Sequence, residues 1–326
     1  MDFIARRILF YFSAFIIAIS FNFLIPRLMP GDPVDAMFAG AMGKMDPSQM
    51  DAVRAMYGFV EGPLWEQYLS YLLSVINWDL GPSILLFPTP VSEVIMIGLP
   101  WTLFLAGTSM VITVILGILA GTYSATNRGK WFDSIVPPLT MVISAFPYVV
   151  SALVIFYIFG LKLKWFPLSY AYNPELDPTL SWAFISNIFY HAALPLLSMI
   201  VVGISGWLFN MRNALINVLG EDYITMAQAK GLSSWRIMIR YSQRNAILPV
   251  MTAISMSIGF ILAGSLFTEV VFNYPGLGNL MLKAINARDY PLIQAILLLI
   301  VMCMLLANFI ADLLLIWLDP RLSIAS

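Results

Sequence analysis

The sequence predicts an all-α integral membrane protein with six transmembrane helices and an external loop subdomain. Hydrophobic residues make up 60% of the chain, charged residues make up 11%, and the mean hydropathy is +0.85. An ordinary soluble domain carries about 25% charged residues, so a soluble core does not match this composition. The apolar residues also gather in runs near the length of about 20 residues that one helix needs to cross a bilayer.

The composition also excludes several other classes. A net charge of −1 leaves no dense basic stripe that could bind nucleic acid. Cys303 is the only cysteine, which excludes a disulfide or a thiolate metal site within the chain.

Six apolar runs account for the expected transmembrane helices. They cover residues 8–25, 99–123, 135–159, 188–210, 247–272 and 292–318. The first run is preceded by Arg6 and Arg7, as in a secretory signal, but it meets Pro26 with no small-residue cleavage site, so we expect a retained helix. The expected division is a first helix at 1–25, an external loop with short helices at 26–98, and a five-helix core at 99–326. The core includes a cytoplasmic segment at 211–246.

The positions of Lys and Arg predict that both termini are cytoplasmic, because cationic loops resist translocation. With that orientation, ten of the 17 Lys and Arg residues lie on the cytoplasmic side. These ten are Arg6, Arg7, Arg128, Lys130, Arg212, Lys230, Arg236, Arg240, Arg244 and Arg321. The opposite segments are longer and hold the other seven, and the acids of the first external loop outnumber its bases.

The external loop contains two predicted short helices. Asp46 and Pro47 form a favourable N-cap and first helical position, so a helix is expected over 47–57. A second is expected over 64–76, where apolar and tyrosine side chains recur on one side at helical spacing. The loop is either a cap on the membrane surface or a docking platform for an external partner, and the two are compatible. Candidate docking residues are Asp46, Asp51, Glu61, Glu66, Pro275 and Gly276.

The most informative segment is the polar, cation-rich stretch at 220–250, which lies between two apolar runs. Glu221 and Asp222 suit the positive end of a helix dipole. Lys230 falls near the expected end of the helix, and Gly231 is a natural C-terminal stop.

This helix has one short face made of Tyr223, Met226 and Ala227, and the small residues Ala227, Ala229 and Gly231 permit close approach. A helix of about three turns is marginal in water alone and is stabilised by packing against something. It is therefore either a loop helix lying on the lipid headgroups or a handle that a partner outside the bilayer grips.

The same segment resembles the cytoplasmic loop signature of ATP-binding-cassette (ABC) importer permeases, specifically the dipeptide, oligopeptide and nickel permease family. The matching stretches are GEDYI at 220–224, AQAKGL at 227–232, RNA at 244–246 and LP at 248–249. The Glu-Ala-Ala opening of the general importer signature is absent. The distance from Gly231 to the Leu-Pro pair is longer than in importers of the maltose type, as is usual for the peptide branch.

Four other regions carry the resemblance along nearly the whole chain. They are IARR at 4–7 with MPGDP at 29–33, WDLG at 78–81, TEVVFNYPGLG at 268–278 followed by RDYP at 288–291, and Asp312 with DPR at 319–321. Each stretch is weak alone, but their order and spacing together are specific to the family.

The resemblance implies a permease subunit of the type I ABC importer kind in a prokaryotic inner (plasma) membrane. Such a subunit forms half of a translocation path with a homologous permease. It sits on two cytoplasmic ABC ATPases and receives di- or oligopeptides from an extracytoplasmic binding protein. Family members that carry oligosaccharides or nickel are the alternatives, and the sequence does not separate these substrates.

The resemblance also places the family's coupling helix, which contacts an ATPase, at residues 221–231. The implied coupling residues are Glu221, Asp222, Tyr223, Met226, Ala227, Ala229, Lys230, Gly231 and Leu232. The chain has no GxxxxGK[ST] phosphate loop, so it is not expected to be an enzyme. ATP and Mg²⁺ would be bound by the partner ATPases, and no cofactor or metal is expected in this chain.

Two ionisable groups lie within the expected transmembrane helices, where burial of charge is costly. Glu269 either lines an outer gate or is satisfied by local backbone or a neighbouring cation. Asp312, at helical spacing from Asn308, is expected to be a polar clamp between helices. Candidate path residues are Ser144, Phe146, Tyr148, Ser151, Ser205, Ser255, Ser257 and Glu269.

Two other function classes match the sequence less well. A self-contained secondary transporter would show more buried charges and an inverted repeat. An intramembrane enzyme would need a Ser/His/Asp or metal cluster at membrane depth, and His191 is the only histidine.

Overall fold

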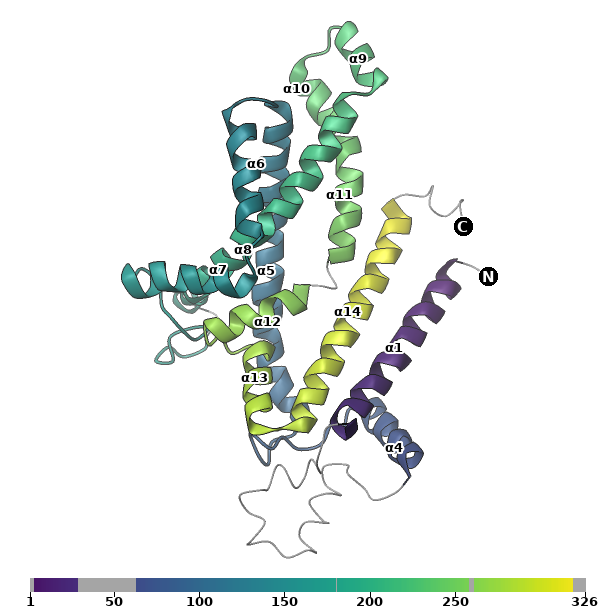
Figure 1. Ribbon diagram of the computed structural model, residues 1–326, viewed down its shortest axis with the longest axis vertical. Helices are drawn as coiled ribbons and strands as arrows, with labels where there is room; N and C mark the ends of the chain where they lie inside the picture. Colours follow the sequence, from purple (N-terminus) through teal and green to yellow (C-terminus); the bar gives the residue numbers. More distant parts are fainter. Residues whose placement is uncertain (1–2, 29–62, 180, 258–260, 319–326) are drawn as a thin grey trace, which may run out of the picture.

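The computed structural model describes residues 3–28, 63–179, 181–257 and 261–318, and Figure 1 shows that helices dominate them. The described residues contain no β-strand. Four of their helices are long and apolar enough to cross a membrane, and a fifth span is present if one bent pair of helices is counted. The all-α membrane fold class is therefore confirmed. The expected fifth span at 247–272 includes residues 258–260, which lie outside the described part, and the domain boundaries remain predictions.

Helix α1 (Phe3–Leu28) and helix α14 (Tyr290–Leu318) lie side by side and form one flank of the molecule. Apolar side chains on α1 remain exposed, Phe12 at 61% and Phe21 at 63%, as expected for a helix that faces lipid. Polar pairs fix how α1 sits on α14. The side-chain amide of Asn22 donates to the backbone carbonyl oxygen of Gln294 at 2.8 Å, and the side-chain amide of Gln294 donates to the backbone carbonyl oxygen of Asn22 at 2.9 Å.

Asp312 is confirmed as a clamp between helices, although its partners differ from the expected Asn308. The Tyr11 hydroxyl donates to Asp312 Oδ2 at 2.7 Å, and Arg7 Nη1 lies 2.9 Å from the same oxygen. Both partners belong to α1. The helical spacing of Asp312 and Asn308 therefore did not indicate a contact, because the neighbouring helix supplies stronger partners for a carboxylate.

Helix α4 spans Leu64–Ile76, so the prediction of a helix over 64–76 is confirmed. Val75 is buried with Ile19 of α1 and Leu298 of α14, and the Tyr68 hydroxyl lies 2.7 Å from Ser20 Oγ. Helix α4 is therefore held against the C-terminal part of α1 and the N-terminal part of α14. The helix expected over 47–57 lies outside the described residues.

Helices α5 (Val91–Thr126) and α8 (Trp182–Leu219) form the central axis of the molecule. They contain 36 and 38 residues. At 1.5 Å per residue each is more than 50 Å long, well beyond a hydrocarbon layer of about 30 Å. The expected spans at 99–123 and 188–210 therefore identified the helices correctly but were too short at both ends.

The expected third span at 135–159 is not one straight helix. Helix α6 (Trp131–Ser144) ends before Pro147, and helix α7 (Tyr148–Ile155) continues into the π-helical segment η1 (Phe156–Lys162). The two halves meet at an angle of 104°. Because proline disfavours helical backbone at the residue before it, Pro147 accounts for the break. Figure 1 shows α7 running across the direction of α5 and α6.

The remaining elements lie at the two ends of this axis. Helix α9 (Asp222–Ala229), the short α10 (Ser234–Arg236) and the π-helical segment η2 (Ile237–Gln243) lie beyond the end of α8. Helix α11 (Arg244–Ser257) then returns along α8. Helix α12 (Ile261–Val271) and helix α13 (Leu277–Ala287) lie nearer the opposite end and lead into α14.

Asp289 joins the start of α14 to residues 83–85. Its Oδ2 accepts hydrogen bonds from Ser83 Oγ at 2.6 Å, from the Ile84 amide at 2.8 Å and from the Leu85 amide at 2.9 Å. Its Oδ1 accepts the Leu292 amide at 3.1 Å. This buried carboxylate therefore caps α14 and fixes the segment that precedes α5.

Candidate functional site

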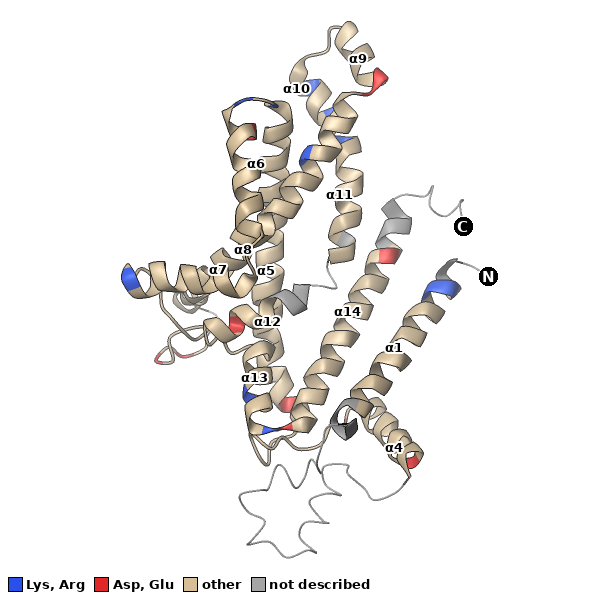
Figure 2. Cartoon of the chain, viewed as in Figure 1, with Lys and Arg blue, Asp and Glu red and all other residues tan. Residues whose placement is uncertain are grey.

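Helix α9 is the outermost element at one end of the molecule, and Figure 1 shows it at the tip of α8 and α11. Gly220 ends α8, and Glu221 in extended conformation begins α9, so only two residues separate the helices. Figure 2 shows Lys and Arg gathered on α8, α10 and α11 around this end. The expected coupling segment therefore follows helix α8 of the central axis after a two-residue link.

The C-terminus of α9 is closed by a Schellman motif. The Leu232 amide donates to the Ala227 carbonyl oxygen at 3.3 Å, and the Gly231 amide donates to the Gln228 carbonyl oxygen at 2.9 Å. Gly231 has a φ of +72°, a left-handed conformation that glycine adopts without steric cost. The prediction that Gly231 stops this helix is therefore confirmed.

A small core of its own holds α9 in place. Ile224 and Ala227 of α9 are buried against Ile237 of η2, and Leu232 packs on them. The apolar contact of Leu232 with the last turn of the helix is the one that commonly accompanies a Schellman motif. A helix this short is marginal alone, so this core and the C-terminal closure keep it formed at an exposed tip.

The expected face of Tyr223, Met226 and Ala227 needs correction, because Ala227 points inward. Tyr223 and Met226 are exposed, Met226 at 61%, whereas Ala227 is 3% exposed. The two small residues at the end of the segment, Ala229 and Gly231, are exposed with Lys230, and Leu232 is half-buried. Short sequence spacing did not distinguish the two sides of an eight-residue helix, because the packing partner, η2, follows it in the chain.

The outer surface of the tip combines apolar and charged groups. Trp235 is 75% exposed beside the exposed Arg236, and Glu221 and Asp222 are exposed at the start of α9. The side-chain amide of Asn245 donates to the Tyr223 hydroxyl at 2.9 Å, which connects α9 to α11. An apolar and mixed-charge surface on a pre-formed tip is suited to a protein groove.

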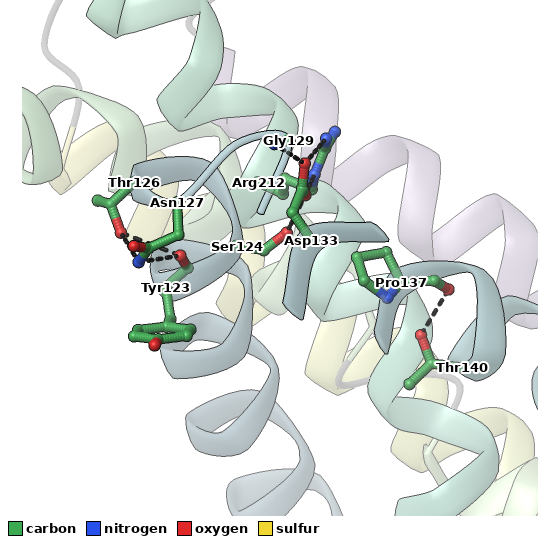
Figure 3. A network of polar contacts seen from close by, with 9 residues as sticks. All are labelled: Tyr123, Ser124, Thr126, Asn127, Gly129, Asp133, Pro137, Thr140 and Arg212. Atoms are coloured by element: carbon green, nitrogen blue, oxygen red, sulfur yellow. Dashed lines mark hydrogen bonds and ion pairs between the residues drawn. The ribbon is translucent and has the colours of Figure 1, made fainter. Parts of the chain in front are cut away.

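A buried ion pair lies below the tip and was not identified from the sequence. Arg212 Nε lies 2.6 Å from Asp133 Oδ1, and Arg212 Nη2 donates to Asp133 Oδ2 at 3.0 Å (Figure 3). Ser124 Oγ donates to Asp133 Oδ1 at 2.5 Å, and the Gly129 amide donates to Oδ2 at 3.0 Å. The expected third span began at residue 135 and so left Asp133 in a solvated loop. An acid next to an apolar run was the available signal.

Glu269 is fully buried, and its Oε2 accepts the Gly278 amide at 2.7 Å, so it caps the start of α13. A Cβ at Gly276 would lie 2.6 Å from Thr102 Oγ1, which shows how closely this turn approaches the carboxylate and α5. In this structure the backbone-satisfied alternative describes the Oε2 atom of Glu269, and a role at an outer gate remains a prediction.

The other candidate path residues are dispersed. Ser205 is also buried, and its place on a translocation path remains a prediction. Phe146 and Tyr148 are exposed on either side of the Pro147 break, and Ser144, Ser151 and Ser257 are half-buried. The side chain of Ser255 lies outside the described part.

The candidate docking residues fall in three groups. Asp46, Asp51 and Glu61 lie outside the described residues. Glu66 is exposed in the first turn of α4, and Pro275 is half-buried. Gly276 is buried and is therefore corrected to an internal packing position.

Within the described residues, no group of three or more His, Cys, Asp or Glu side chains could hold a metal ion.

Comparison with known proteins gives consistent matches along nearly the whole chain. Residues 113–324, which include α9, match the family described as "Binding-protein-dependent transport system inner membrane component". A di/tripeptide transport system permease protein of Pseudomonas aeruginosa is 32% identical over 336 residues, covering 99% of this chain and 98% of the relative.

Two further relatives agree. A dipeptide transport system permease protein of Escherichia coli (strain K12) is 30% identical over 338 residues, covering 99% of this chain and 98% of the relative. A glutathione transport system permease protein of Salmonella choleraesuis is 32% identical over 322 residues, covering 99% of each chain.

Proposed function

This chain belongs to the family of binding-protein-dependent transport system inner membrane components, and from that premise we propose how it works. It is a multi-pass permease subunit of the peptide-transport branch of ABC importers, and we propose that its own cargo is di- or oligopeptides. The relatives named for dipeptides, di- and tripeptides and glutathione support that substrate class.

The observation that carries the proposal is the pre-formed tip. Helix α9 is closed by Gly231, has its own core with η2, and presents Met226 outward, and Trp235 of α10 is exposed beside Arg236. A groove on a cytoplasmic ATPase would bind this tip, and closure of the ATPases would then displace α8 and α11 together. Rigid-body motion of this kind is the usual form of alternating access.

The proposed partners are a homologous second permease, two cytoplasmic ABC ATPases and an extracytoplasmic binding protein. ATP and Mg²⁺ bind to the ATPases, and this chain performs no hydrolysis. In the proposed orientation, both termini and α9 are cytoplasmic. The arrangement supports it, because the start of α1 and the end of α14 are the ends of these two helices that are nearer to α9, whereas α4 lies at the opposite end (Figure 1). The side with α4 would receive the binding protein.

The test is uptake into proteoliposomes that contain this chain, the second permease, both ATPases and the binding protein. Radiolabelled dipeptide should enter only with ATP and with every component present. Uptake of an oligosaccharide or Ni²⁺ instead would reassign the cargo. Ion-driven uptake by the purified chain alone would establish a secondary transporter and reject the proposal.

The tip itself is tested by Met226→Arg, which places a cation on the outer face of α9. ATP-dependent uptake should fall while the amount of membrane-inserted protein is unchanged. Met226→Leu is the matched control, because it keeps an apolar side chain of similar volume. Equal uptake by all three proteins would remove Met226 from the contact.

A further inference from the structure

The buried pair of Asp133 and Arg212 lies outside the coupling segment, and its geometry is that of a rigid joint. The guanidinium faces the carboxylate through two nitrogen atoms, at 2.6 and 3.0 Å. The side chains are 20% exposed for Arg212 and 6% exposed for Asp133. A bidentate pair fixes the relative orientation of its partners as well as their distance, which a single point contact does not.

The joint connects three parts of the chain. Arg212 belongs to α8, Asp133 to the first turn of α6, and Ser124 to the last turn of α5 (Figure 3). Ser124 donates to the carboxylate and accepts from Arg212 Nε at 3.1 Å. The Gly129 amide adds a bond from the turn between α5 and α6. The carboxylate is therefore fully engaged by α5, α8 and the turn.

Close packing of α5 on α8 continues directly from this joint. A Cβ at Gly121 would lie 2.5 Å from the Leu208 carbonyl oxygen and 2.9 Å from Met211 Cβ, so the α8 backbone lies against the glycine. Gly121 precedes Ser124 by three residues and shares its face of α5. The helices cannot slide past one another here without breaking both the packing and the ion pair.

The position of the joint relates it to coupling. Arg212 lies two turns before the end of α8, which leads through Gly220 into α9. Asp133 lies in the first turn of α6, which leads through the 104° break at Pro147 into α7. The pair therefore lies on a route from α9 to α6 and α7.

We propose that Asp133 and Arg212 are positioning residues for transport. They hold α5, α6 and α8 together as one rigid unit, called the lever below, which transmits movement of α9 to the broken α6–α7 segment. This inference rests on the proposed function, because it requires that ATPase partners move α9. Ser124 and Gly129 hold the carboxylate in the orientation that the lever needs.

The experiment measures uptake per ATP hydrolysed in the assembled transporter, together with the amount of complex and its thermal unfolding. Arg212→Gln should destabilise the chain, because it leaves a buried carboxylate without its cation. The double variant Asp133→Asn with Arg212→Gln removes that unpaired charge, so its thermal stability should recover. Uptake per ATP in the double variant should still be about tenfold below wild type. A factor of this size corresponds to an interaction free energy within the range found between residues of one network.

Arg212→Lys keeps the charge but not the bidentate geometry, so its uptake per ATP should lie between those of wild type and the double variant. The matched control is Asp312→Asn, which breaks the other inter-helix ion pair described, between α14 and α1. Asp312 is bonded to Arg7 and Tyr11 of α1, outside the joint of α5, α6 and α8, and its variant should keep the wild-type uptake per ATP even if stability falls.

The outcomes separate this inference from the proposed function. If Met226→Arg lowers uptake per ATP but the Asp133/Arg212 double variant matches wild type, the lever is wrong and the coupling role of α9 stands. If stability and the ratio recover together in the double variant, the pair is only structural and the inference is overturned. If the wild-type assembly shows no ATP-dependent uptake, the proposed function itself fails.

Discussion

Replacing Gly231 by valine should loosen helix α9, the proposed coupling helix, without disturbing the rest of the chain. The backbone at Gly231 has a φ of +72°, and a Cβ added there would meet no heavy atom within 4 Å. The added Cβ therefore causes no clash, and we expect the effect to come from the left-handed backbone. That conformation costs an L-residue about 1–2 kcal/mol, and a β-branched residue lies at the upper end.

This cost is large for an element of eight residues. A difference of about 1–2 kcal/mol changes a two-state ratio by a factor of about 5–30. The C-terminal closure of α9, with its bonds from Leu232 to Ala227 and from Gly231 to Gln228, would open more often by that factor. Hydrogen exchange at these amides should accelerate accordingly, and uptake per ATP should decline.

The control at the same position is Gly231→Asn, because asparagine tolerates the left-handed conformation better than other L-residues. The expected order of uptake per ATP is glycine, asparagine, alanine and then valine. Wild-type exchange and uptake in the valine variant would refute this reasoning. So would an asparagine variant as impaired as valine, since that result would implicate side-chain bulk in place of backbone conformation.

Three further substitutions test the framework that carries the tip. Gly121→Ala places a Cβ 2.5 Å from a backbone oxygen of α8 and should lower the free energy of unfolding by about 1–3 kcal/mol. Gly107→Ala in the same helix should not lower it, and thermal unfolding in detergent measures both variants. Asp289→Ala removes the acceptor of four donors, so we expect a loss of about 3 kcal/mol or more and faster proteolysis at 83–85. Glu269→Gln retains an oxygen for the buried amide of α13 and should be about 1–3 kcal/mol more stable than Glu269→Ala; equal unfolding temperatures would contradict the capping role.

The sequence alone predicted the elements whose signals are local. The helix at 64–76 and the stop at Gly231 follow from apolar spacing and from glycine at a helix end, and both are confirmed. The long apolar runs gave the fold class, although α5 and α8 continue past the bilayer length at both ends. Hydropathy detects the part of a helix that lipid solvates, and it does not report where the helix stops in water.

Features that depend on tertiary contacts were predicted less well. The inward direction of Ala227 is set by η2, and the burial of Glu269 is set by the turn at Gly276 and by α13. The pair of Asp133 and Arg212 joins residues 79 apart in the chain. No periodicity within one helix can indicate such a contact, because the two partners belong to different helices, α6 and α8.

The most direct test of the coupling role is cysteine cross-linking in the assembled transporter. Cys303 is the only native cysteine, so Met226→Cys in a Cys303→Ser background provides a single thiol on the outer face of α9, and Glu66→Cys on α4 provides the control. We predict that Met226→Cys cross-links to an ATPase subunit with a yield that changes when ATP is added, and that Glu66→Cys does not. Absence of an ATPase cross-link from Met226→Cys in a complex that still transports would contradict the central claim.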